Sequence, residues 1–458
     1  MRLSWVSVFL AACSAAAEPA DWIVSAGTVV TMDGSRRVIE NGAAAIKGAS
    51  ILAVGPRAEI DRAYQPRQRI DRPTAILAPG LINTHTHAPM SLFRGIADDL
   101  RLQEWLEKYI FPAEAKNVSA EFCRWGTRLA VLEMLLSGTT TYTDMYYFED
   151  VIAEETKAAG MRGVLGETVI GFPVPDAKTP ADALRFTEGF LRRFQNDPLI
   201  VPAVAPHAVY TNSAETLKAA RALANKYGAP MLIHLSETKK ENDDLRAKLG
   251  MSPTAYLESL GALEGRTLGA HGVWLDDADL EILRRRGTGL AHCPSSNMKL
   301  ASGVAAVVKQ LSLGLNVGLG PDGPAGSNND FSLFEEMDLA AKLQKVTTMD
   351  PRALPAEQAF AMATILGARA LGLGGKIGSL EKGKLADMIL IRTDQAHASP
   401  MYNPYSHLVY ALKGSDVTDV FVNGRVVVRN RAPLTLDSGA ILAKAKEYRQ
   451  RISASLKN

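Results

Sequence analysis

Short apolar runs alternate with helical patterns through the middle of the chain. Most neighbouring runs are separated by a stretch with the apolar spacing of a helix, and alternation of this kind predicts a parallel sheet. The runs are 80–85, 139–143, 162–166, 201–205, 231–235, 267–271, 289–292 and 316–320. Eight such strands predict closure into a (β/α)8 TIM-type barrel, an α/β fold whose active sites lie at the carboxyl ends of the strands.

Two of the intervening helices have clear boundaries. The segment from Ser119 to Leu136 has helical spacing, and Gly138 can end it. Its predicted apolar face consists of Phe122, Trp125, Leu129, Leu132 and Leu136. Residues 355–357 begin another helix, because proline is tolerated in the first helical turn.

The two flanks of the barrel region have a different hydrophobic pattern. Short strand-like runs separated by Gly and Asp-Gly turns indicate a small β domain in both flanks. We expect residues 21–78 and 371–435 to pair into one small β-sandwich domain built from both ends of the chain. Residues 79–370 would then form the barrel, and 436–458 a C-terminal helix.

The first 17 residues are typical of a targeting signal. Arg2 precedes a short apolar stretch, and small residues follow it, as in a secretory signal peptide. Residues 10–13 also resemble a bacterial lipoprotein box, which would place a lipid on Cys13 and anchor the protein to the membrane. Cleavage after the alanines at 15–17 is the alternative, and an ordinary N-terminal tail is the third reading. The protein is accordingly expected to be exported, either periplasmic or lipid-anchored, and to be cytoplasmic if the signal is not used.

Composition and charge narrow the class of protein. Hydrophobic residues make up 47% of the chain, too many for a disordered protein. The 51 basic and 49 acidic residues are well mixed and form no basic stripe, so no nucleic-acid partner is expected. Three cysteines cannot build a disulfide framework, and Cys123 and Cys293 are expected to be unpaired thiols.

Six of the eight histidines lie at or just past a predicted strand end: His85, His87, His207, His234, His271 and His292. In an extended strand residues i and i+2 point to the same side, so His85 and His87 can face one metal ion. A third imidazole and a carboxylate would complete a site with one position left for water. His234 and Asp322 are the best-placed candidates.

Several ordered blocks of sequence carry a resemblance to a known family. They are 79–87, 90–106, 110–114, 205–207, 234–238, 271–272, 292–300, 322–330 and 378–387. In these blocks the sequence resembles the amidohydrolase superfamily. It is most similar to the branch of 5′-methylthioadenosine/S-adenosylhomocysteine deaminases and chlorohydrolase-like enzymes.

The resemblance implies roles for individual residues. His85, His87, His234 and Asp322 would bind one divalent metal, with zinc expected, Glu237 would shuttle protons, and His271 would orient the attacking hydroxide together with Asp322. The substrate-binding candidates are Trp105 and His207 in a nucleoside pocket, Glu114 on the ribose hydroxyls, His292 behind or beside the pocket, and Arg185 or Arg162 on an amino-acid tail. The fourth strand lacks the lysine that bridges two metals in other members, which favours a single metal.

The residues themselves support this chemistry. A bound metal lowers the pKa of water toward about 7. Glu237 follows His234 by three positions, so its carboxyl can approach the same water. Pro321 departs from the family's usual Gly-Thr-Asp-Gly and removes a backbone N–H from the loop before Asp322.

The predicted function is hydrolytic deamination of an adenine nucleoside, namely 5′-methylthioadenosine, S-adenosylhomocysteine or adenosine. One alternative is a hydrolase of another heterocycle, such as a chlorotriazine, guanine or a pterin. The other alternative is an inactive binding protein, although such a protein has no need for Glu237 beside four metal ligands. A homodimer is an open option.

Overall fold

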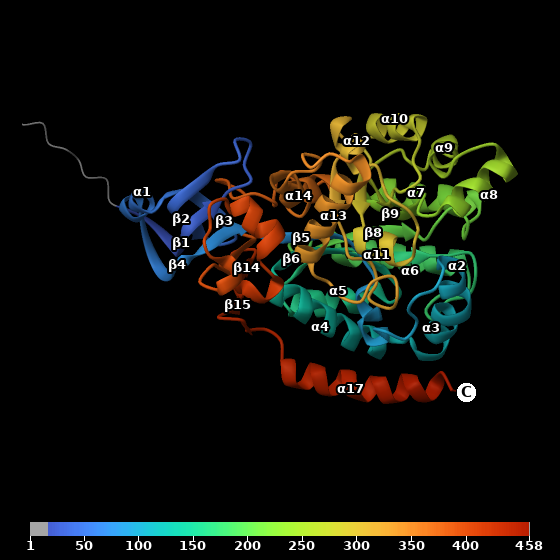
Figure 1. Ribbon diagram of the computed structural model, residues 1–458. Helices are drawn as coiled ribbons and strands as arrows, with labels where there is room; N and C mark the ends of the chain where they lie inside the picture. The colour runs from blue at the N-terminus through green and yellow to red at the C-terminus, as the bar shows by residue number, and fades with distance from the viewer. Residues whose placement is uncertain (1–16, 458) are drawn as a thin grey trace, which may run out of the picture.

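The computed structural model describes residues 17–457, and the predicted export signal with Cys13 lies outside them apart from residue 17. A closed barrel of eight parallel strands forms the centre of the molecule, which confirms the predicted TIM-type fold (Figure 1). Around the barrel the strand order is β10-β11-β12-β5-β6-β7-β8-β9. The strands are β5 (Leu81–Thr86), β6 (Thr139–Tyr146), β7 (Arg162–Val169), β8 (Ile200–Pro206), β9 (Met231–Leu235), β10 (Thr267–His271), β11 (Gly289–His292) and β12 (Val317–Leu319).

The barrel closes where its last strand meets its first. Leu319 of β12 pairs with Asn83 of β5, and this is the one register pair between the two strands. Side chains of β5 reinforce the contact: the Thr84 hydroxyl donates to the Leu319 carbonyl at 2.9 Å, and the Thr86 hydroxyl to the Asp322 carbonyl at 2.8 Å. The closure therefore sets the end of β5 directly beside the loop that follows β12.

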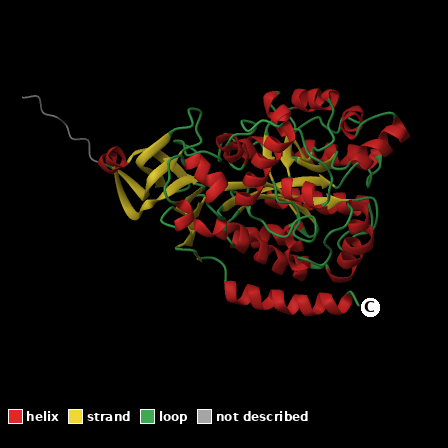
Figure 2. Ribbon diagram, in the orientation of Figure 1, coloured by secondary structure: helices red, strands yellow, loops and turns green. Residues whose placement is uncertain are grey.

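Helices surround the barrel (Figure 2). Between β5 and β6 lie η1 (Ala88–Phe93), α2 (Leu102–Glu104), the π-helix η2 (Trp105–Ile110), α3 (Phe111–Asn117) and α4 (Ala120–Leu136). The later helices are α5 (Glu149–Ala158), α6 (Pro180–Phe194), α7 (Ala214–Tyr227), α8 (Lys239–Leu249), α9 (Pro253–Ser259), α10 (Asp277–Arg286), α11 (Pro294–Lys299), α12 (Val307–Ser312), α13 (Leu333–Thr348), α14 (Ala356–Met362), α15 (Ile365–Ala370) and α17 (Ser438–Ser455).

The predicted boundaries of α4 are confirmed, but its predicted apolar face is only partly right. Ser119 caps the helix by accepting the Phe122 N–H. The most buried stripe contains small residues, because η1 packs so closely that a Cβ on Gly126 would lie 2.3 Å from the Pro89 carbonyl oxygen. Trp125, Leu129 and Leu136 are half-buried at the side of the helix instead.

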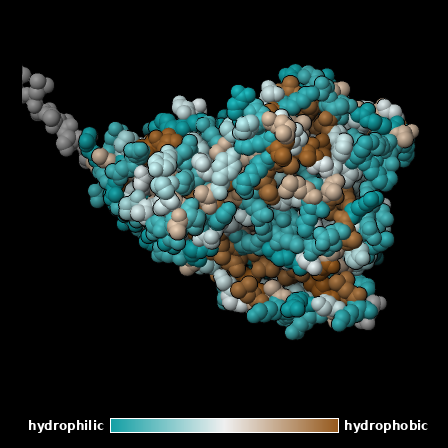
Figure 3. All heavy atoms as spheres, viewed as in Figure 1, coloured by the Kyte–Doolittle hydropathy of each residue, from teal (hydrophilic) through white to brown (hydrophobic). Residues whose placement is uncertain are grey.

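The C-terminal helix α17 covers part of that side of α4 (Figure 1). The ring of Tyr448 meets that of Phe122 edge-on at 5.7 Å, and Lys444 lies over Trp125. Figure 3 shows apolar surface along the boundary between α17 and the barrel.

The two flanks pair into one β domain, as predicted. The sheet order is β16-β15-β14-β13-β4-β1-β2-β3, so the expected sandwich takes the form of one mixed sheet in which all eight strands are hydrogen-bonded in series. Its strands are β1 (Glu18–Val30), β2 (Val38–Lys47), β3 (Ser50–Pro56), β4 (Tyr64–Pro79), β13 (Met388–Arg392), β14 (Val417–Val422), β15 (Arg425–Arg429) and β16 (Ala432–Pro433).

One predicted turn in this domain is wrong. The strand-like runs 22–24 and 28–31 are expected to be separated by a turn, but Gly27 between them lies within β1, where the register with β4 shifts between Ala26 and Thr28. The Pro73 carbonyl approaches so closely that a Cβ on Gly27 would lie 2.2 Å from its oxygen. A glycine inside a strand marks such a bulge as readily as a turn.

Cys123 and Cys293 are free, buried thiols, as expected. Within residues 17–457, the length and apolar character needed to cross a membrane are not combined in any helix.

Candidate metal centre and active site

Imidazoles from β5 and β9 meet at the carboxyl end of the barrel. His85 and His87 point to the same side of β5, with ring centroids 5.0 Å apart. The ring of His234, from β9, lies 5.0 Å from His85 and 5.4 Å from His87. Asp322, in the loop after β12, places its Oδ1 atom 3.3 Å from the Nε2 atoms of both His85 and His87. The ligand atoms of His85, His87 and Asp322 thus lie within 4.8 Å of one another, and the ring of His234 stands beside this group.

Hydrogen bonds behind the cluster fix the orientation of the rings. The Nδ1 of His87 donates to the Met145 carbonyl at 2.7 Å, and the Nδ1 of His234 to the His207 carbonyl at 2.9 Å. Each bond directs the Nε2 atom of its ring at the centre, as in metal sites generally. Asp322 is held in turn by the Ser296 hydroxyl, which donates to Oδ2 at 2.7 Å.

The donor set fits a divalent cation. Burial lowers the pKa of His85 to about 4 and that of His234 well below its usual value, so both rings are neutral, the form that binds metal. Burial also opposes protonation of His87, but the hydrogen bond to Asp322 outweighs it and raises the pKa to about 9. His85 Nε2 is buried with no hydrogen-bond partner among the described residues. A cation shared by these atoms would satisfy that nitrogen and neutralise Asp322.

His271 also lies within reach of the centre. Its ligand nitrogen and those of His85 and His234 lie within 4.8 Å of one another, which makes a second group that overlaps the first. The Nδ1 of His271 is 3.1 Å from Oδ1 of Asn297. The ring is therefore placed either to contact an ion or to orient a water molecule beside it.

Glu237 borders the same centre. Its Oε2 lies 3.8 Å from Nε2 of His271, and its Oε1 is buried without a partner among the described residues. Burial raises the pKa of this carboxyl to about 8, and the nearby Asp322 charge acts in the same direction. The carboxyl group is thus shielded from bulk water and free to exchange a proton with a bound molecule.

Strained backbone surrounds the centre. Ser236, His271 and Asp322 have φ values of +51°, +72° and +66°, a region that residues other than glycine rarely adopt. Glu241 supports the first of these bends, because its carboxylate accepts the N–H groups of Ser236 at 3.2 Å and Glu237 at 2.8 Å. Strain of this kind persists only where the surrounding contacts hold it.

A pocket with a cavity volume of about 60 Å3 opens above the centre. Its lining includes four of the predicted metal and proton-transfer residues, His87, His234, Glu237 and Asp322, together with His271 and the predicted substrate residues Trp105, Glu114 and His207. The remaining lining is mostly apolar: Met90, Leu102, Leu106, Ile110, Phe111, Met145, Tyr146, Tyr147, Thr168 and Tyr210. Apolar walls with a few convergent polar groups are typical of small-molecule sites.

The three predicted substrate residues in the pocket are fixed in place. The Trp105 indole N–H donates to the Ala325 carbonyl at 2.9 Å, and Nδ1 of His207 lies 3.0 Å from the Thr211 hydroxyl. Glu114 accepts the Tyr146 hydroxyl at 2.7 Å, while burial raises the pKa of its carboxyl to about 7.

Three other predicted residues are not brought to the pocket. Arg185 is exposed on α6 and pairs with Asp182 on its own helix, because this face of α6 points to solvent. Arg162 begins β7, at the opposite end of the barrel, and is buried against Asp387. His292 ends β11 as predicted but is buried outside the pocket lining, where burial lowers its pKa to about 3.

Residues that orient the site were missed by the sequence analysis. Ser296 and Asn297 lay inside the quoted block 292–300, but their contacts with Asp322 and His271 cross between strands. Tyr146 ends β6 and is not part of a distinctive motif. Glu241 stands four positions after Glu237 in a helix start, a spacing that could have indicated contact.

Comparison with known proteins agrees with this geometry. Residues 76–427 match the amidohydrolase family. A protein of Syntrophus aciditrophicus named 5-methylthioadenosine/S-adenosylhomocysteine deaminase 1 is 47% identical, over 96% of this chain and 99% of its own length. An adenosine deaminase from Xanthomonas campestris with bound zinc superposes with a TM-score of 0.94 at 38% identity, covering 96% of this chain and all of the other. An atrazine chlorohydrolase from Arthrobacter aurescens, complexed with zinc, gives 0.85 at 25% identity over 93% of this chain and all of its own.

Proposed function

The chain belongs to the amidohydrolase family, and on this basis we propose that it is a metal-dependent hydrolytic deaminase of adenine nucleosides. The observation that carries the proposal is the position of Glu237 beside a cluster of imidazoles and Asp322, in a pocket that Glu114 also lines. A proton-transfer group, a metal centre and a diol acceptor are what the hydrolysis of a nucleoside amine requires.

In this proposal His85, His87, His234 and Asp322 hold one divalent ion, and zinc is the metal we propose. When bound, the ion would supply a nucleophile at neutral pH by lowering the pKa of water. His271, held by Asn297, orients the water together with Asp322. The zinc-bound structural neighbours support the choice of metal.

Glu237 carries the protons. It takes a proton from the water and delivers it to ring nitrogen N1 while the water oxygen bonds to C6 of the adenine. A second proton then moves from the added hydroxyl to the amino group, and the C6–N6 bond breaks to release ammonia. Water and the aminopurine are consumed, and the hypoxanthine nucleoside and ammonia are formed, so atoms and charge balance. General acid–base help of this kind is worth about 10²- to 10⁴-fold.

The pocket residues position the nucleoside. Glu114 can accept both hydroxyls of a ribose diol, because a carboxylate offers two oxygens in one plane. Trp105 and His207, each fixed by its own hydrogen bond, line the wall beside the base. In this proposal the sugar lies beside Glu114 and the amine lies beside the metal ligands.

A panel of substrates tests the proposal. Purified, zinc-loaded protein is assayed for ammonia release from adenosine, 5′-methylthioadenosine, S-adenosylhomocysteine and guanine, and for chloride release from a chlorotriazine. We expect ammonia from the adenine nucleosides. Chloride from the triazine with no ammonia from any nucleoside would assign the chain to the chlorohydrolase-like alternative, and turnover of none would indicate a binding protein.

A further inference from the structure

A second cleft adjoins the pocket. It shares Phe111, Glu114 and Tyr147 with the pocket, and its other walls are Ala115 and residues 172–175. Phe111 and Phe172 form one wall as an aromatic pair, with ring centroids 5.2 Å apart and planes at 67°. The two spaces therefore adjoin at the three shared residues, and Glu114 lines both of them.

The position of Glu114 determines what enters this cleft. The orientation of the substrate is taken from the proposed function, in which the amine lies beside the metal ligands and Glu114 holds the ribose hydroxyls. The substituent on ribose C5′ then points away from the ligands and past Glu114. The space beyond Glu114 is the cleft beside Phe172.

The walls of the cleft suit an apolar substituent. Phe111, Tyr147, Phe172, Pro173 and Pro175 present rings and methylenes, and among the described residues that line the cleft or the pocket there is no Lys or Arg. The one carboxyl group among the described residues that line the cleft is that of Glu114. A substituent bearing a carboxylate would find like charge and apolar surface here.

We infer that this cleft is the subsite for the 5′ substituent and that it selects uncharged, apolar groups such as a thioether over an amino-acid tail. Phe172 is the specificity-determining residue in this inference, because it forms the outer wall and is 36% exposed, so it contributes to the cleft more than to the core.

The test compares kcat/KM for adenosine, 5′-methylthioadenosine and S-adenosylhomocysteine. We expect 5′-methylthioadenosine to exceed S-adenosylhomocysteine by about tenfold or more, the penalty for placing a charged group without a partner. In Phe172→Ala, kcat/KM for 5′-methylthioadenosine should fall by about tenfold, mainly through KM, since a methylthio group loses apolar contact. Adenosine, which has no such substituent, should change by less than about twofold.

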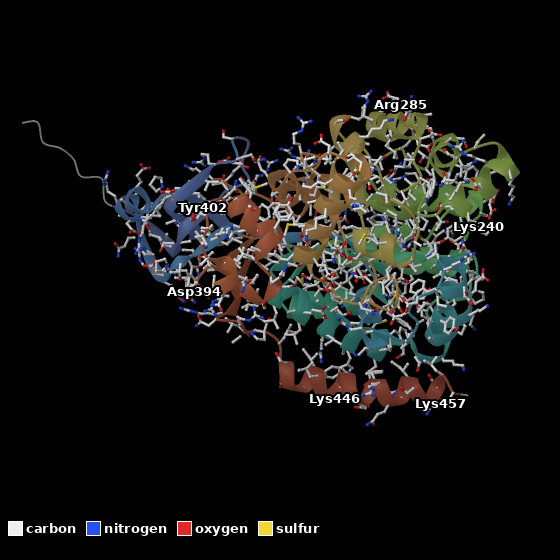
Figure 4. All side chains as sticks on the ribbon, in the orientation of Figure 1. Lys240, Arg285, Asp394, Tyr402, Lys446 and Lys457 are labelled. Atoms are coloured by element: carbon white, nitrogen blue, oxygen red, sulfur yellow. The ribbon has the colours of Figure 1, made fainter. Side chains whose placement is uncertain are left out.

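Two further variants complete the experiment. Tyr402→Ala removes an equally large, exposed aromatic ring in the small-domain half of the molecule (Figure 4), and it should leave all three substrates unchanged. Phe172→Arg supplies a guanidinium to the cleft and should raise the ratio of S-adenosylhomocysteine to 5′-methylthioadenosine turnover by about tenfold.

Different outcomes separate this inference from the proposed function. Equal or better turnover of S-adenosylhomocysteine, or equal losses of adenosine and 5′-methylthioadenosine turnover in Phe172→Ala, would overturn the inference while the deaminase proposal stands. Failure to release ammonia from any adenine nucleoside, adenosine included, would overturn both.

Discussion

Replacing Glu237 by glutamine tests the proposed chemistry most directly. The amide has the same shape as the carboxyl group but cannot accept and return a proton. The residue is only 4% exposed, so bulk water cannot substitute for its carboxyl group. Asp322 and Glu114, the other carboxylates in the pocket lining, are engaged by Ser296 and Tyr146 respectively.

The expected loss of kcat follows from the absence, among the described residues, of any other group that could transfer these protons. Proton transfer by one positioned group is worth about 10²- to 10⁴-fold, and Glu237 serves both the water and the ring nitrogen. We expect Glu237→Gln to lower kcat by about 10³-fold or more, or about 4 kcal/mol in activation free energy. Because Glu237 is not among the proposed metal ligands, zinc content and thermal stability should be preserved.

The assay follows the ultraviolet change as an aminopurine becomes a hypoxanthine, with metal content measured on the same preparation. Glu264→Gln, a surface substitution just before β10 at the opposite end of the barrel, is the matched control and should retain wild-type kcat. Turnover within about tenfold of wild type in a fully metal-loaded Glu237→Gln protein would refute the role of this carboxyl, since a lost proton shuttle costs at least about 10².

Three other predictions concern the metal, the support of Glu237 and the targeting signal. His85→Ala should lose stoichiometric zinc and show a lower melting temperature that added zinc does not restore; retained stoichiometric zinc would remove His85 from the ligand set. Glu241→Gln should lower kcat by about tenfold or more with metal retained, because an amide oxygen can accept only one of the two N–H groups the carboxylate holds. Burial raises the pKa of Glu241 to about 8, above its unfolded value near 4.5, so its contribution to stability is full below pH 4.5 and is lost as the pH rises through 8. The fall in melting temperature over that window should therefore be smaller in Glu241→Gln, and an equal fall would contradict this account. Finally, we propose that Cys13 carries a lipid, so Cys13→Ser should move the protein from the membrane fraction to the soluble fraction; unchanged partitioning would reject the anchor.

The strands and the ligand positions could be predicted because they follow local rules. A buried parallel strand is a short apolar run between turns, and β9, β10 and β11 begin and end at the predicted residues. The side-chain period of two places His85 and His87 on one side of β5 without knowledge of the rest of the fold. The barrel rule then brings His234 to the same end of the sheet.

Other features depend on contacts between distant segments, and the hydrophobic pattern of the sequence does not predict those contacts. Arg185 was a candidate because of its charge, yet the orientation of α6 turns it toward solvent and Asp182. The buried stripe of α4 depends on how closely η1 approaches Gly126. The spacing of apolar residues in the sequence does not predict that distance. Ser296 likewise became recognisable as a support for Asp322 only once β11 and β12 were adjacent.

The meeting of β5 and β12 has a consequence for stability. Thr86 and Asp322 are 236 positions apart in sequence, and the proposed ligands lie on both sides of this single-pair contact. An ion held there would join the beginning and the end of the barrel chain as a cross-link does. Constraining so long a loop removes much of the entropy of the unfolded chain, by the reasoning applied to disulfides. No disulfide is present among the described residues. The ion proposed for catalysis would then also act as the cross-link that stabilises the barrel domain.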